Sequence, residues 1–81
     1  MNIRVRLFAS FREAAGTSTL AWEAPAGSSV AEVVAALRAA YPAFGPTAEK
    51  ALLAVNQEYV GAEYRLRDGD ELALIPPVSG G

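Results

Sequence analysis

The chain of 81 residues contains no cysteine and no histidine. Without cysteine it can form no disulfide, iron–sulfur cluster or zinc–thiolate site, and it has no thiolate nucleophile. Without histidine it lacks the commonest acid–base group near neutral pH and the commonest metal ligand. The remaining residue types offer no nucleophile paired with a base. We therefore expect a protein that is not an enzyme on its own and that holds neither a metal nor a permanently bound cofactor.

Positive charge is scarce as well. Seven arginine and lysine residues stand against nine aspartate and glutamate residues, which gives a net charge of −2. A non-specific nucleic-acid binder needs a basic face, and the cations here are spread thinly along the chain. The uncharged runs are broken by proline and glycine and fall short of the roughly 20 apolar residues of a membrane span. Arg4 and Arg6 lie where a signal peptide would have its apolar core. We expect a cytoplasmic protein that binds neither nucleic acid nor membrane.

The chain is long enough for one domain. Its apolar residues recur with the periods of strands and helices. Strict alternation at the N-terminus predicts a half-buried strand, with Phe8 on its polar side. Ser10 with Glu13, and Ser29 with Glu32, have the spacing of helix capping boxes. The helical connection is predicted at 10–15 and the main helix at 29–41; strands are predicted at 17–23 (antiparallel to the first), 51–55, 58–60 and 71–75.

This order of elements indicates an α+β fold, in which one main helix packs on one face of a sheet. It resembles the β-grasp, or ubiquitin-like, fold. By that resemblance the sheet is mixed, and the first and last strands are parallel neighbours at its centre. We expect the β-grasp domain to span residues 1–77 and a flexible C-terminal Gly-Gly tail to follow at residues 78–81.

Polar residues precede the last strand. Asp68, Asp70 and Glu71 are predicted to form a solvated turn, since their spacing does not match the loop of an EF-hand calcium site. Leu66, isolated among polar neighbours, is predicted to plug the core.

The tail consists of Val78, Ser79, Gly80 and Gly81, after a stiff spacer of Pro76 and Pro77. Four extended residues reach roughly 13–14 Å, and glycine, which has no Cβ, can thread a narrow channel. The Gly81 carboxylate has a pKa of about 3.3–3.7 and is unreactive until it is activated, for example as an acyl adenylate made by a separate ATP-using enzyme. Sulfur can then attack to give a thiocarboxylate. An ordinary frayed terminus has a similar composition, so the tail by itself leaves both interpretations open.

Four segments share their sequence pattern with one family, and they cover about half of the chain. Residues 8–16 resemble the F-A-x-x-R-E-x-x-G signature of the MoaD family, the small sulfur-carrier subunits of molybdopterin synthase. Residues 54–57 are similar to its A-V-N-Q turn, and residues 66–73 to its L-x-D-G-D-E stretch. Residues 75–81 resemble its P-P-V-[S/T]-G-G end.

The resemblance implies a sulfur carrier. A MoeB-like, ubiquitin-activating-type adenylyltransferase would use ATP to adenylate Gly81, which would then become a thiocarboxylate. The tail would enter a MoaE-like large catalytic subunit, with which the carrier would form a heterotetramer. There it would give sulfur to cyclic pyranopterin monophosphate, forming the dithiolene of molybdopterin in molybdenum cofactor biosynthesis.

The same tail end of the sheet is expected to carry a docking patch. By alternation Phe8 and Ile75 lie on the outer side of their strands, near where the tail emerges. Large apolar residues beside a functional arm indicate a partner-binding surface, although single exposed apolar residues are also common. The resemblance adds Tyr59 to this patch, and we include Pro76 and Pro77.

Two other classes use the same tail. One is a sister ubiquitin-like carrier that serves thiazole, cysteine or transfer-RNA thiolation. The other is a ubiquitin-like protein modifier, or a plain interaction module, whose terminus forms an isopeptide bond. The signature at residues 8–16 and the Pro-Pro-Val start of the tail favour the molybdopterin synthase carrier.

Overall fold

The first strand, β1 (Asn2–Leu7), gives the sheet its two faces. In the computed structural model, which describes residues 1–77, Ile3, Val5 and Leu7 are buried, while Asn2 and Arg4 are exposed. Each buried aliphatic side chain contributes about 1.5–3 kcal/mol relative to leaving it in water. The alternation predicted for this segment is therefore confirmed, and it separates an inner, apolar face from an outer face.

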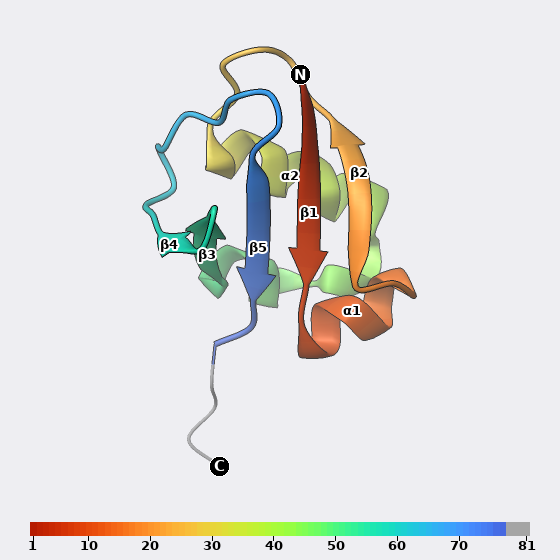
Figure 1. The fold of residues 1–81 in the computed structure, drawn as a ribbon. Helices are drawn as coiled ribbons and strands as arrows, with labels where there is room; N and C mark the ends of the chain where they lie inside the picture. Colours follow the sequence, from red (N-terminus) through yellow and green to blue (C-terminus); the bar gives the residue numbers. More distant parts are fainter. Residues whose placement is uncertain (78–81) are drawn as a thin grey trace.

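Five strands form one mixed sheet in the order β2-β1-β5-β3-β4 (Figure 1). Besides β1, the strands are β2 (Thr19–Glu23), β3 (Leu52–Val55), β4 (Glu58–Tyr59) and β5 (Glu71–Ile75). β1 runs parallel to β5 at the centre, and the other three pairings are antiparallel. This is the β-grasp arrangement, so the predicted fold is confirmed.

The main helix, α2 (Val30–Ala40), covers the inner face of the sheet (Figure 1). Its buried stripe consists of Val30, Val33, Val34 and Leu37, which follow the helix period. They pack in one core with Leu72 and Leu74 of β5 and with Leu66, which plugs the core as predicted.

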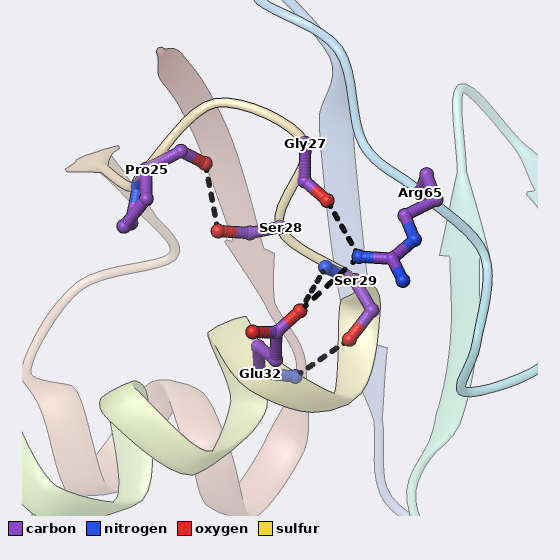
Figure 2. Close-up of polar contacts among 6 residues, drawn as sticks. All are labelled: Pro25, Gly27, Ser28, Ser29, Glu32 and Arg65. Carbon is purple, nitrogen blue, oxygen red and sulfur yellow. Dashed lines mark hydrogen bonds and ion pairs between the residues drawn. The ribbon is translucent and has the colours of Figure 1, made fainter.

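Both ends of α2 follow from the sequence. At the start, the Glu32 amide donates to the Ser29 hydroxyl at 3.2 Å, and the Ser29 amide donates to the Glu32 carboxylate at 2.9 Å (Figure 2). This is the predicted capping box. At the other end Tyr41 leaves the helical region with φ −126°, as expected for a residue before proline.

The first helix, α1 (Ala9–Ala15), corrects the other predicted capping box. The helix begins one residue before Ser10, with Phe8 at its N-cap and no side-chain cap bond. Ala9 has φ +50°, which turns the chain sharply out of β1. Ser10 therefore lies inside the first turn, where its hydroxyl cannot cap the helix, and the predicted pairing with Glu13 is wrong. Gly16 ends the helix with φ +78°, as its freedom at positive φ allows.

The segment after α2 contains two short 3₁₀ helices, η1 (Pro42–Phe44) and η2 (Pro46–Lys50). Phe44 is buried against Phe11 of α1 with ring centres 5.2 Å apart, and it stacks on Tyr41 at 5.3 Å. These aromatic contacts hold η1 and α1 to each other at one end of the core.

The predicted solvated acidic turn is wrong for Asp70. This residue is buried, and its carboxylate accepts hydrogen bonds from the Asn56 side chain at 3.0 Å and from the Arg67 amide at 2.8 Å. The Asn56 side-chain oxygen in turn accepts from the Glu71 amide at 3.0 Å. A buried carboxylate needs such partners. The turn therefore fastens the β3–β4 hairpin to the start of β5.

None of the helices within residues 1–77 is both long enough and apolar enough to cross a bilayer.

Candidate functional site

The carboxyl ends of β1 and β5 bring distant parts of the sequence together. The parallel register pairs Leu7 with Leu74, so Phe8 and Ile75 follow at the same end of the sheet (Figure 1). β5 ends at Ile75, directly before Pro76, which can donate no amide hydrogen bond. Pro76 is half-buried and Pro77 is exposed.

The predicted tail begins at this point. Val78, Ser79, Gly80 and Gly81 lie outside the described residues, so the boundary between domain and tail and the role of Gly81 stay predictions. The last described residues, Pro76 and Pro77, follow Ile75 at the sheet end that also carries Phe8.

The outer face of the sheet is apolar near this end. Leu52 pairs with Ile75, and Ala54 pairs with both Ala73 and Tyr59. We call this surface the outer apolar patch; it consists of Phe8, Leu52, Ala54, Tyr59, Ala73 and Ile75. Tyr59 is 74% exposed and Leu52 45%, and a contiguous patch of exposed apolar side chains can mark an interaction surface. The patch contains three of the predicted partner-binding residues, although partner binding itself stays a prediction.

Leu52 was not predicted to belong to this surface. The run at residues 51–55 is almost continuously apolar, and such a run is typical of a strand buried on both sides. In the structure β3 alternates: Val55 lies in the core, and Leu52 points to the outer face. The alternation of β3 follows from its pairing with β5 and not from its own sequence.

A hollow of about 210 Å³ opens within the patch. Its lining combines small residues with larger ones around them: Arg6, Phe8, Ala54, Gln57, Tyr59, Glu71, Ala73 and Ile75. Ala54 and Ala73 are register partners on adjacent strands. Because neither has more than a methyl group, the surface is recessed where they meet, and the larger neighbours stand above it.

Charged side chains border the hollow on the β1 side. The Arg6 guanidinium carbon lies 5.2 Å from the centre of the Phe8 ring, a cation–π distance. Glu71 lies 3.8 Å from Arg4 and 3.7 Å from Arg6. Exposed ion pairs of this kind contribute about 0–1 kcal/mol to stability. They bring the two guanidinium groups near one carboxylate on the outer face.

The titratable side chains of the described residues form no metal-ligating cluster. Residues 1–77 contain no group of three or more acidic, histidine or cysteine side chains that could hold a metal ion. Glu32 has a lowered pKa, because its carboxylate accepts hydrogen bonds from the Ser29 backbone and side chain and lies near the Arg65 cation. Arg65 also donates to the Gly27 carbonyl at 3.0 Å (Figure 2). The low pKa of Glu32 is thus explained by its hydrogen bonds at the start of α2.

Comparison with known proteins places the chain in a family. A model described as the ThiS family matches residues 5–81. A molybdopterin synthase sulfur carrier subunit from Chlamydomonas reinhardtii is 41% identical over the whole of both chains. Another from Dictyostelium discoideum is 37% identical over 99% of this chain and 96% of its own. Among solved structures, SAMP1 of Haloferax volcanii, a small archaeal modifier protein, matches the whole of both chains with a TM-score of 0.84 and 31% identity. The chain therefore belongs to the ThiS family, and its predicted likeness to the sulfur carriers of molybdopterin synthase is confirmed over its full length.

Proposed function

We propose that this protein is the sulfur-carrier subunit of molybdopterin synthase. The observation that carries the proposal is the 41% identity to such a subunit over the whole of both chains. The Pro-Pro-Val-Ser-Gly-Gly sequence at residues 76–81 supports it, because a carrier needs a slender terminus that can enter another protein's active site.

The chemistry takes place on the Gly81 carboxylate. A carboxylate oxygen attacks the α-phosphorus of ATP on a MoeB-like adenylyltransferase, which forms an acyl adenylate and releases pyrophosphate. Hydrosulfide then attacks the acyl carbon, AMP leaves with the bonding electrons, and loss of the proton on sulfur leaves a thiocarboxylate. The carrier itself supplies no acid or base, and ATP binds to the activating enzyme.

The thiocarboxylate then acts in the large, MoaE-like catalytic subunit. Its sulfur is transferred to cyclic pyranopterin monophosphate, and two carrier turnovers supply the two sulfur atoms of the molybdopterin dithiolene. The two subunits form a heterotetramer in this proposal. The outer apolar patch adjoins Pro76 and Pro77, so a subunit that covers the patch also receives the tail.

Intact mass spectrometry tests the proposal. The full chain is incubated with its cognate adenylyltransferase, ATP and a sulfur donor, and the mass is expected to rise by the difference between sulfur and oxygen. A matched chain that lacks Gly81 should show no rise. Absence of the rise in the full chain would contradict the sulfur-carrier role. Adding the large subunit and the pterin precursor should then remove the sulfur; if the sulfur is retained, the chain is a sister carrier for another pathway.

The likeness to an archaeal modifier protein favours a second candidate, a protein modifier whose terminus forms isopeptide bonds. Lys50, the single lysine of the chain, is the one possible lysine acceptor if the protein forms chains on itself. Covalent ladders on target lysines that disappear when Gly81 is deleted would support this candidate. Their absence, together with sulfur transfer to the pterin, would support the carrier role.

A further inference from the structure

The outer face of the sheet changes its character along the strands. At the tail end lies the outer apolar patch. Further from the tail end, Arg6 of β1 pairs with Ala73 of β5. Arg4 lies two residues before Arg6 in β1 and pairs with Glu71. A partner that covers the patch at the tail end therefore also comes to lie over these arginines.

The arginines leave positive charge on this part of the surface. Arg4 and Arg6 share a single carboxylate, that of Glu71, at 3.8 and 3.7 Å. Within this group of three side chains two cations face one anion, in a protein whose net charge is −2. The arginine side chains are 69% and 42% exposed and the glutamate side chain 23%, so the positive groups face solvent.

Docking on the patch removes water from this charge. A guanidinium that loses its water without a counter-ion destabilises a complex, whereas one that meets a carboxylate gains charge-assisted hydrogen bonds. Glu71 pairs with both arginines but carries a single negative charge. The Arg6 guanidinium lies near the Phe8 ring at 5.2 Å and near Glu71 at 3.7 Å, so it stands at the border of the apolar patch.

We propose that the outer face recognises a surface of the large synthase subunit that combines one apolar side chain with a carboxylate. The apolar side chain enters the 210 Å³ hollow over Ala54 and Ala73, and the carboxylate pairs with Arg6 and Arg4. This inference rests on the proposed function, since it specifies the chemistry of that partner. Arginine suits this role better than lysine, because its planar fork can bind a carboxylate through two parallel hydrogen bonds.

The test measures binding of the full carrier chain to the large subunit at several salt concentrations. Arg6→Glu is expected to weaken binding about tenfold or more at low salt, mainly through slower association, and Arg6→Lys should bind with intermediate affinity. The double variant Arg4→Gln/Arg6→Gln should lose most of the salt dependence of the association rate. Arg38→Gln is the matched control, because Arg38 pairs with Glu49 at 2.7 Å away from this face, and it should change affinity less than about twofold.

The outcomes separate this inference from the function on which it rests. If the double variant binds as tightly as the parent chain with unchanged salt dependence, while Phe8→Asp abolishes binding, the carboxylate pairing is wrong and the proposed function stands. If the parent chain does not bind the large subunit at all, both are wrong. The inference is supported if replacing an acidic residue of the large subunit by lysine restores binding of the Arg6→Glu variant and weakens binding of the parent chain.

Discussion

The two faces of the sheet are built from the same strands and have opposite properties. On the inner face, Val5, Leu72 and Leu74 are completely buried. On the outer face, the side chains one position away in the same strands, such as Arg6, Ala73 and Ile75, remain partly exposed. The inner face therefore determines stability and the outer face is free to determine recognition. A substitution at an inward-facing strand position should change stability, and one at the next, outward-facing position should change partner binding.

The largest effect is expected for Leu74→Ala on the inner face. Removing a fully buried leucine side chain should lower the free energy of unfolding by about 2–5 kcal/mol, through lost transfer free energy and the cavity that remains. Leu52→Ala is the matched change on the outer face; since that leucine is 45% exposed, it should cost about 1 kcal/mol or less. Urea denaturation measures both. Equal losses would show that the outer face contributes to stability as much as the core.

The next comparison uses two phenylalanines that lie close in sequence. Phe11 is buried with 1% exposure, whereas Phe8 is half-buried on the outer face. Phe11→Asp should unfold the chain, because an unpaired carboxylate would be buried. Phe8→Asp should leave it folded and should weaken binding to the large subunit and to the activating enzyme. Circular dichroism and a binding assay test the pair, and an unfolded Phe8→Asp variant would make Phe8 a core residue.

A smaller effect is expected from the two Ser-x-x-Glu segments, which have equal spacing and different structures. Ser29→Ala removes a cap of α2 and should lower the free energy of unfolding by about 1 kcal/mol. Ser10→Ala removes no cap bond and should change it by less than about 0.5 kcal/mol. Denaturant midpoints for the two variants measure this difference. Equal effects would mean that the Ser10 side chain also caps a helix in solution.

The smallest effect concerns pH. The pKa of Glu32 is lowered in the folded protein by its hydrogen bonds with Ser29, so the unfolded chain binds the proton more readily. The stabilisation is therefore fully present above the unfolded pKa of about 4.3 and is lost as the pH falls through the lower folded value. Relative to Glu32→Gln, the parent chain should lose part of its stability advantage in that acidic range. A stability difference that stays constant with pH would exclude this contribution.

Sequence periodicity predicted the elements whose structure is decided locally. The alternation of β1 and β5 and the helix stripe of α2 lie within one element each, and the Ser29 capping box depends on residues three apart. The parallel pairing of β1 with β5 came from family resemblance, since nothing in either strand alone specifies its neighbour.

The features that were not predicted depend on residues distant in the sequence. Phe44 is buried because its ring packs against the rings of Phe11 and Tyr41. Asp70 is buried because Asn56 supplies a hydrogen bond across the sheet. Leu52 is assigned to the outer face only by its pairing with Ile75. At the candidate site, alternation placed Phe8 and Ile75 correctly, whereas the hollow over Ala54 and Ala73 required the register of two strands.

The central position of β5 has a consequence for the making of this protein. β5 lies between β1 and β3, so without it the sheet consists of two separate hairpins, β2–β1 and β3–β4. Isolated two-stranded hairpins are marginally stable in water. Because Pro76 directly follows β5, the segment that leads to Gly81 is anchored only once both halves have joined. If Gly81 is activated as proposed, a nascent or damaged chain with an incomplete sheet would present it without this anchor, so activation would depend on completed folding.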